Sequence, residues 1–434
     1  MRTLPTTPLL RGPLALLALA SLVMLLRVPD ERTHWWGITG NLIDINVYRW
    51  GGHAVLTGIP LYEAALFGDD SGRFYPAMPF TYPPFSALLF TPLELLSVPL
   101  MEALWAALTL LLLYLAVRMC FRALGYAPDR VTVQVSLLLA VIALTLEPVR
   151  TTLWLGQINL LLLVLVLADQ LASRSGRPWA RRLAGVGSGL AAGIKLTPAF
   201  FWAHWLVTGR WRVAAVSLGA FAATVAVGFA VVPRDAVRYW SGTLFESQRI
   251  GEDATVANQS LRGVIARLAG VDMAPTWVWL VGAAVVGLAS LAVAALAHRA
   301  GHELLALTLS GMTMTMVSPF SWGHHWVWFV PLLVVAVHLA VVGGRWFLWA
   351  VPVLLWAAAA NWVQSFPNPE FPDDRWVAMG LFMLAGDIPA WLYGIITNVY
   401  PIVWLVTVVA TALWVWRARG DSRTGAAEPA LRSR

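Results

Sequence analysis

Apolar segments long enough to cross a lipid bilayer recur along the whole chain, and short polar loops separate them. A helix needs about 20 mostly apolar residues to span a hydrocarbon core of about 30 Å. The chain has 434 residues, of which 59% are hydrophobic and only 12% are charged, and its mean hydropathy is +0.69. A soluble domain exposes far more polar surface. The sequence therefore predicts an all-α polytopic membrane protein with about 10–13 membrane helices, some of them broken or re-entrant.

The positive charge of the chain is spread rather than concentrated. A net charge of +7 would suit a nucleic-acid partner, but the arginines lie in short loops between apolar segments, so we expect no nucleic acid and interpret them as topology signals. Lysine occurs once, as Lys195. Cys120 is the only cysteine, which excludes an internal disulfide and a cysteine metal site. No small-residue cleavage site follows the first apolar run, residues 9–28, so we expect a retained helix.

Arginine-rich turns mark one side of the membrane, which the positive-inside rule makes cytoplasmic. They lie at residues 118–130, 174–182, 210–212, 298–299, 345 and 417–423. The polar motif loops then fall on the other side, so we expect a multi-pass protein of the cell (plasma) membrane with an extracytoplasmic site. The predicted crossings are residues 9–28, 100–118, 131–147, 157–172, 213–232, 276–298, 303–317, 325–342, 346–361 and 398–416.

Three further apolar stretches, residues 84–98, 183–207 and 376–396, do not fit the alternation of sides. They must be re-entrant, interfacial or paired crossings. The middle stretch breaks at the sequence Gly-Ile-Lys-Leu-Thr-Pro, residues 193–198. Proline disfavours a continuous helix there and frees backbone groups that need polar partners.

One integral-membrane domain is expected over residues 1–416, followed by a disordered cytoplasmic tail over 417–434. Residues 29–83 form the longest stretch without a crossing and are interpreted as the first extracytoplasmic loop. Helical spacing within this loop predicts an amphipathic helix at the membrane interface. The residues with this spacing are Val47, Trp50, Gly51, Ala54 and Val55.

Asp44 begins the motif Asp-Ile-Asn-Val-Tyr, which ends at Tyr48, shortly after the first predicted crossing. Two interpretations are open. Aspartate is a preferred helix N-cap and is common in solvated loops. Alternatively, Asp44 is a general base at the membrane surface, where partial desolvation raises the pKa of a carboxylate.

His324 and His325 follow Ser-Pro-Phe-Ser-Trp-Gly, in which Trp322 is the tryptophan. A histidine pair at an interface is an ordinary amphipathic feature, but it can also donate hydrogen bonds to an anion. Adjacent residues diverge on a helix, so the pair is a poor metal site. Trp322 is either part of an interfacial tryptophan belt or a surface on which a sugar stacks.

Lys195 lies within an apolar segment, where a charge is costly and needs a partner, so it marks either an anion site or a structural ion pair. Glu147, Arg150, Gln157 and Asn159 cluster at a helix-to-helix junction. Each alone fits a helix cap, whereas together they form an unusually polar junction.

With these residues in place, the chain resembles glycosyltransferase family 87, a family of polytopic GT-C enzymes that use polyprenyl-phosphate sugars. The resemblance spans about residues 40–335 and rests on eight motifs in the family's order. They are Asp-Ile-Asn-Val-Tyr, Leu-Tyr at 61–62, Phe-Thr-Tyr-Pro-Pro, Glu-Pro-Val-Arg, Gly-Gln-Ile-Asn, Gly-Ile-Lys-Leu-Thr-Pro, Asn-Gln-Ser-Leu-Arg-Gly and Ser-Pro-Phe-Ser-Trp-Gly-His-His-Trp-Val-Trp.

The resemblance implies a GT-C fold and an inverting transfer of mannose from polyprenyl-phosphate mannose. Asp44 would take the proton of the acceptor hydroxyl, and one of His324 and His325, with Lys195 and Arg262, would stabilise the leaving phosphate. A monophosphate leaving group needs little charge neutralisation, so we expect no cofactor and no obligatory metal. The remaining expected donor-binding or acceptor-binding residues are Tyr48, Tyr62, Tyr82, Glu147, Arg150, Gln157, Asn159, Asn258, Gln259 and Trp322.

Within the family, the motifs are most similar to those of an α-1,2-mannosyltransferase that extends phosphatidylinositol mannosides. Relatives that elongate lipomannan or lipoarabinomannan, or transfer arabinofuranose, share the frame and stay open as alternatives. A lipid-linked sugar transporter or flippase is the rival class, which the intramembrane lysine favours and the lack of an internal repeat disfavours. A structural scaffold would leave Lys195 and the Asp44 and His324 motifs unexplained. The expected partners are membrane lipids and the two lipid-linked substrates, and we expect a monomer.

Overall fold

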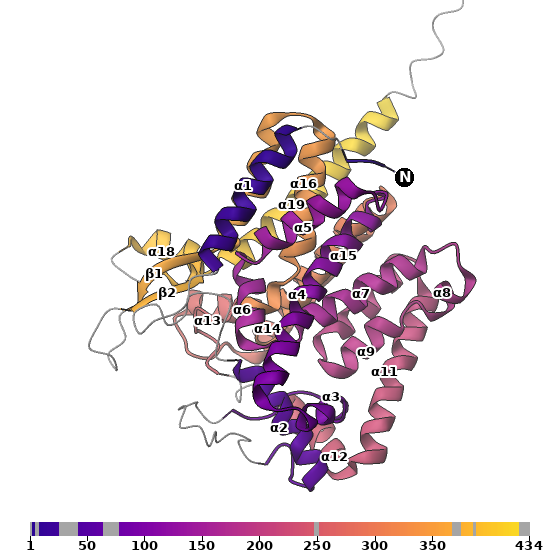
Figure 1. Ribbon diagram of the computed structural model, residues 1–434, viewed down its shortest axis with the longest axis vertical. Helices are drawn as coiled ribbons and strands as arrows, with labels where there is room; N and C mark the ends of the chain where they lie inside the picture. The colour runs from indigo at the N-terminus through magenta and orange to yellow at the C-terminus, as the bar shows by residue number, and fades with distance from the viewer. Residues whose placement is uncertain are drawn as a thin grey trace, which may run out of the picture.

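The computed structural model consists almost entirely of helices (Figure 1). It describes residues 2–4, 8–25, 42–63, 78–246, 251–366, 375–384 and 388–424. Four helices in these ranges are long and apolar enough to cross a membrane by themselves. They are α4 (Val98–Ala123), α11 (Trp211–Val231), α14 (Thr276–Arg299) and α19 (Val399–Thr424), the last over its residues up to Ala418.

A fifth candidate span is a bent pair, α6 (Glu147–Leu155) and α7 (Asn159–Ser173), whose axes differ by 119°. The bend falls at Gly156, which has φ +73°, and at Gln157. A left-handed backbone suits glycine because it has no Cβ. The polar junction expected around Glu147 to Asn159 is therefore the bend of a broken helix.

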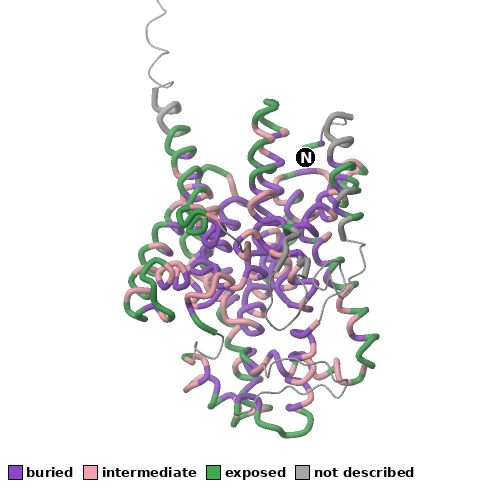
Figure 2. Tube along the Cα trace, turned by 90° about the vertical axis from the view of Figure 1, so that its left-hand side faces the viewer, coloured by how far each residue is buried: buried purple, intermediate pink, exposed green. Residues whose placement is uncertain are grey.

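The other predicted crossings coincide with shorter helices. Among the described residues, fewer helices than the expected 10–13 are therefore long enough to cross a membrane by themselves. A helix of 15 residues is only about 22 Å long. These helices are α1 (Pro8–Leu25), α5 (Arg130–Ala143), α15 (Glu303–Val317), α16 (Phe329–Gly343), and η6 (Trp346–Trp349) with α17 (Ala350–Ala359). Helices α15 and α16 are buried along most of their length. Figure 2 shows that buried segments lie at the centre of the molecule and exposed ones at its periphery.

The stretch 183–207 is broken as expected. Helix α9 (Val186–Ile194) ends at Lys195, whose backbone is extended, and η2 (Thr197–Phe200) and α10 (Phe201–Val207) follow. The short helix α8 (Pro178–Leu183) connects α7 to α9. The ammonium group of Lys195 thus projects from a break between two short helices.

The helix expected in the first loop is α2 (Ile43–Thr57), which packs against α3 (Pro84–Phe90) and η1 (Thr91–Leu95). These elements lie near one end of the molecule with α12 (Pro233–Ser241), as Figure 1 shows. The helix η3 (Thr243–Phe245) follows α12, and α13 (Leu261–Ala269) precedes α14. The parts of the loop at 29–41 and 64–77 lie outside the described residues.

Of the three forms expected for residues 376–396, re-entrant, interfacial or paired crossings, the structure rules out the paired crossings. Strand β2 (Arg375–Gly380) pairs antiparallel with β1 (Asn361–Phe366), with Asn361 opposite Gly380. The helices η7 (Leu381–Met383) and α18 (Ala390–Ile396) follow. Seven helical residues span only about 10 Å, so none of these pieces can cross a bilayer.

The C-terminal region also differs in part from the expected disordered tail. Helix α19 continues through residues 417–424, and residues 425–434 lie outside the described part of the chain.

Candidate active site

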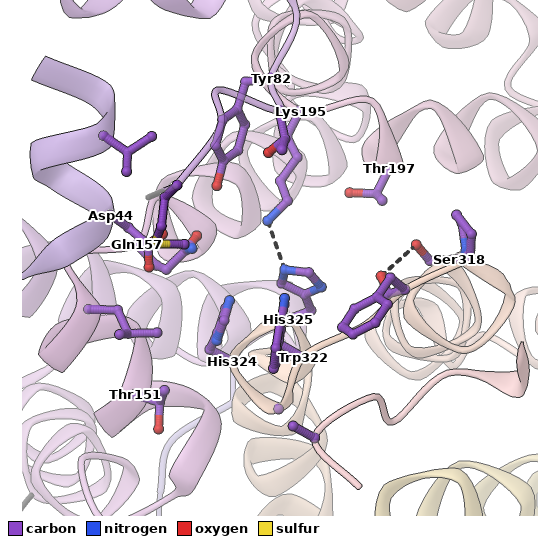
Figure 3. A pocket seen from close by; sticks show the side chains of 18 of the residues that line it. Asp44, Tyr82, Thr151, Gln157, Lys195, Thr197, Ser318, Trp322, His324 and His325 are labelled. Carbon is purple, nitrogen blue, oxygen red and sulfur yellow. Dashed lines mark hydrogen bonds between the residues drawn. The ribbon is translucent and has the colours of Figure 1, made fainter. Parts of the chain in front are cut away.

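A cavity of about 870 Å³ lies where α2, the bend between α6 and α7, the break after α9 and the loop between α15 and α16 converge. Strand β2 contributes Ala378, Met379 and Gly380 to its wall. The expected site residues that line it are Asp44, Tyr82, Glu147, Arg150, Gln157, Lys195, Trp322, His324 and His325. Asp44 and His325, which are 281 positions apart in sequence, therefore share one cavity, as expected for Asp44 and the histidine pair (Figure 3).

Asp44 is the second residue of α2 and only 8% exposed. The N-cap of α2 is Leu42, which has a left-handed backbone with φ +48°, so helix capping does not explain Asp44. Burial raises the pKa of Asp44 to about 6, although a hydrogen bond from Gln157 and the charge of Lys195 act in the opposite direction. A carboxyl group with this pKa is largely ionised at neutral pH and is a stronger base than an exposed aspartate.

Tyr48 and Tyr62 hold the residues around Asp44 in place through hydrogen bonds. The Tyr48 hydroxyl donates to Oε1 of Gln157 at 3.1 Å and lies 3.1 Å from the Tyr82 hydroxyl. The Tyr62 hydroxyl donates to the Tyr82 backbone carbonyl at 2.7 Å. Tyr48 and Tyr62 do not line the cavity, so their contacts position Gln157 and Tyr82.

Lys195 lies on another wall of the cavity. Its Nζ donates to Oδ1 of Asn159 at 3.2 Å and lies 3.0 Å from Nε2 of His325. The Tyr82 ring lies below the ammonium, 5.6 Å from Nζ to the ring centroid. Lys195 has no carboxylate within ion-pair distance in the described part of the chain, so the structure does not support the alternative of a direct structural ion pair.

His324 and His325 lie on the turn η5 (Gly323–Trp326), with their rings 4.7 Å apart and nearly perpendicular. Burial, followed by the charge of Lys195, lowers the pKa of both imidazoles well below its usual value, so both are neutral at pH 7. Nε2 of His324 is buried and has no hydrogen-bond partner among the described residues. The backbone carbonyl of His324 accepts a hydrogen bond from Asn159 Nδ2 at 2.9 Å, which places Asn159 behind the cavity wall.

Glu147 and Arg150 lie one helical turn apart on α6, so they share the face that lines the cavity. The Tyr400 hydroxyl donates to Oε2 of Glu147 at 2.7 Å. A side chain at Gly323 would collide with the Glu147 carboxylate, so the histidine turn and α6 pack closely there. Arg150 donates to the Ala378 carbonyl at 3.0 Å and so anchors β2 over the cavity.

The structure does not bring Asn258, Gln259 and Arg262 to the cavity. Arg262 forms a buried ion pair with Asp253 at 2.7 Å. Asn258 Oδ1 accepts from the backbone N–H of Ser321, and Gln259 Nε2 donates to the Thr397 carbonyl. These three residues hold the loop that carries the histidines, and Arg262, expected at the leaving phosphate, lies outside the cavity wall.

Several polar residues of the cavity were not anticipated. They are Thr151, Thr197, Tyr239, Thr243, Glu246 and Ser318. Thr197 and Ser318 lie in the sequence motifs that contain Lys195 and His324. Tyr239, Thr243 and Glu246 lie outside all the motifs named above. No cluster of three His, Cys, Asp or Glu side chains suited to a metal ion occurs within the described ranges.

Comparison with known proteins is consistent with this geometry. The chain matches Glycosyltransferase family 87 over residues 80–319. It is 36% identical over 336 residues to a polyprenol-phosphate-mannose-dependent alpha-(1-2)-phosphatidylinositol pentamannoside mannosyltransferase of Mycolicibacterium smegmatis, covering 76% of this chain and 78% of the relative. A protein of Mycobacterium tuberculosis with the same description is 35% identical over 364 residues, covering 81% of this chain and 80% of that protein.

A phosphatidylinositol mannoside mannosyltransferase of M. smegmatis, also polyprenol-phosphate-mannose-dependent, is 36% identical over 381 residues, covering 82% of this chain and 83% of the relative. No solved structure matches the chain. The fold is that of a polytopic GT-C glycosyltransferase. The chain belongs to glycosyltransferase family 87.

Proposed function

We propose that this protein transfers mannose from polyprenyl-phosphate mannose to a phosphatidylinositol mannoside and forms an α-1,2 linkage with inversion. The observation that carries the proposal is that one cavity holds a buried carboxylate, Asp44, and a partly buried cation, Lys195, in a chain whose relatives bear this activity. A base and an anion site are the two groups that such a transfer requires.

The reaction is a single displacement. The acceptor hydroxyl oxygen bonds to the anomeric carbon of the donor mannose, and its proton passes to the Asp44 carboxylate. The bond from that carbon to the phosphate oxygen breaks, and polyprenyl phosphate leaves with the electron pair. Hydrogen-bond donors near Lys195 and the histidine turn bind this oxygen more strongly in the transition state than in the bound polyprenyl-phosphate mannose. They therefore lower the barrier.

The placement of the cavity suits two lipid-linked substrates. The arginine-rich turns predict that the opposite side of the membrane carries the site, which puts it at the outer leaflet of the cell membrane. Donor and acceptor then diffuse in one plane, which reduces the entropy cost of their encounter. Tyr82 and α2 form the acceptor side, and a monomer suffices because the proposed groups come from one chain.

We propose that no metal ion is required, because Lys195 already provides a positive charge for a monophosphate leaving group. The test is a transfer assay with purified protein in nanodiscs, with polyprenyl-phosphate mannose and phosphatidylinositol mannosides of different lengths. Linkage analysis of the product should find a new α-1,2-mannose, with or without a chelator. A product with another sugar or linkage contradicts the assigned function, and loss of activity in chelator that one divalent ion restores contradicts metal independence.

A further inference from the structure

The histidine beside Lys195 has its ring protonation fixed by the contact between them. A lysine ammonium has three donors and no acceptor, so a ring nitrogen 3.0 Å from Nζ must accept a hydrogen bond. That nitrogen is Nε2 of His325. A neutral imidazole carries one proton, which must then be on Nδ1. Lys195 therefore selects one of the two tautomers of His325.

This tautomer presents a free donor to the cavity. His325 lines the cavity, and Nδ1 makes no hydrogen bond to any described residue. Figure 3 shows one ring nitrogen joined to Lys195 and the ring extending away from it into the cavity. Lys195 also keeps a donor, because two of its three N–H groups are taken by Asn159 and His325.

A third donor lies nearby on the segment that carries Lys195. Thr197 lines the cavity, and its hydroxyl makes no hydrogen bond within the described part of the chain. Lys195, Thr197 and His325 also border a second, small pocket of about 20 Å³, so the three side chains are neighbours. In Figure 3, Thr197 lies on the side of His325 that faces Ser318.

Three unpartnered donors of this kind match the chemistry of a phosphate group. In the bound donor the phosphate is a diester with two terminal oxygens and a bridging oxygen to the sugar. When the bond to the sugar breaks, the leaving polyprenyl phosphate is a monoester with three oxygens that accept hydrogen bonds, and charge-assisted bonds to such oxygens are the strong ones. Ser318 is not equivalent to Thr197, because its hydroxyl already donates to the Phe320 carbonyl at 3.0 Å.

We propose that Lys195 Nζ, Thr197 Oγ1 and Nδ1–H of His325 bind the phosphate of the donor, and that Lys195 fixes the His325 tautomer that makes this possible. The proposal rests on the proposed glycosyl transfer and adds two points to it. Thr197 becomes a catalytic residue, and His325 rather than His324 is the donor to the phosphate. Asn159 is a positioning residue, because it holds Lys195 through Oδ1 and the histidine turn through Nδ2.

Two amide substitutions separate the two ends of the His325 ring. The amide nitrogen of asparagine lies as many bonds from Cβ as Nδ1 does, and the terminal amide of glutamine reaches the position of Nε2. His325→Asn therefore keeps a donor toward the phosphate, whereas His325→Gln keeps a partner for Lys195 and loses that donor. We expect kcat to fall about 100-fold in His325→Gln and about 10-fold or less in His325→Asn, because one donor to a developing charge contributes about 10²–10³ in rate.

The same logic applies to Thr197. Thr197→Val has nearly the same shape without the hydroxyl and should lower kcat about 100-fold, whereas Thr197→Ser should stay within about threefold of the wild type. His302 provides a matched control for the amide pair, because it precedes α15 at the end opposite the histidine turn. His302→Asn and His302→Gln should have equal activities.

The activities of these variants are measured in nanodiscs with polyprenyl-phosphate mannose, after circular dichroism has shown that each is folded. In parallel, the ¹⁵N chemical shifts of histidine-labelled protein report which ring nitrogen carries the proton, with His325→Gln used to assign the signal. A protonated Nδ1, together with the Asn-over-Gln and Ser-over-Val preferences, supports the proposal.

Equal or reversed preferences, or a proton on Nε2 of His325, overturn the proposal and leave the transferase function standing if the wild type is active. A wild type that transfers no mannose indicates instead that the proposed function fails, and the chemical shifts then still decide the tautomer.

Discussion

Two polar clusters lie at opposite ends of α15, and their difference separates structure from function. Glu303 is the first residue of α15. Its Oε2 lies 2.7 Å from Arg210, 3.1 Å from His298 and 3.2 Å from Gln170. The Glu303 carboxylate therefore has several donors of the protein beside it, as expected for a cluster that joins helix ends.

The cavity beyond the other end of α15 is incompletely paired. Asp44 has a hydrogen bond from Gln157 but no ion pair, and Nε2 of His324 is buried without a partner in the described part of the chain. Unpaired buried polar groups cost free energy, so natural proteins keep few of them. The comparison indicates that a ligand completes the cavity, whereas the Glu303 carboxylate already has donors from the protein.

Removing Lys195 should lower turnover far more than any substitution in the Glu303 cluster. Lys195→Met is expected to lower kcat about 10²–10³-fold, because the leaving phosphate loses a charged donor. Steady-state kinetics in nanodiscs checks this. A loss confined to KM, with kcat unchanged, would show that Lys195 binds substrate and transition state equally.

The dependence of kcat/KM on pH tests the basic group of the cavity. The base must be unprotonated, and burial raises the pKa of Asp44 to about 6, so kcat/KM should be level above that pH and fall about tenfold per pH unit below it. In Lys195→Met the midpoint should move to higher pH, because the Lys195 charge lowers the Asp44 pKa. A midpoint near pH 4, unaffected by Lys195, contradicts this assignment.

Substitution of Glu303 should lower the stability of the protein and leave its turnover nearly unchanged. Glu303→Gln leaves Arg210 and His298 without a charged partner and is expected to lower the free energy of unfolding by about 1–3 kcal/mol. The kcat of the folded protein should stay within about twofold of the wild type. Thermal unfolding and turnover of the same preparation check both points, and a large loss of kcat without a loss of stability would remove the distinction between the two clusters.

Much of this arrangement could be predicted from the sequence, because it depends on local patterns. Apolar length located the main helices, helical spacing located α2, and a proline after Lys195 located the break in the helix. The resemblance to the family supplied the residues that converge on the cavity, which no spacing along the chain could bring together.

The rest depends on contacts between distant residues. Strand β2 leads into an apolar stretch that continues to residue 396, so composition alone does not show that it pairs with β1. Tyr400 lies in an apolar helix and becomes relevant through its hydrogen bond to Glu147. Arg262 lies in a family motif, but its burial against Asp253 places it in the framework of the loop.

The most direct test of the central claim measures donor binding and turnover in the same preparation of Asp44→Asn, with Asp272→Asn, a change at an exposed position, as the control. If Asp44 is the base, the variant should bind polyprenyl-phosphate mannose within about threefold of the wild-type Kd while kcat falls about 10²–10⁴-fold. Turnover close to that of the control would contradict the account, as would a loss of binding that accounts for the whole loss of activity.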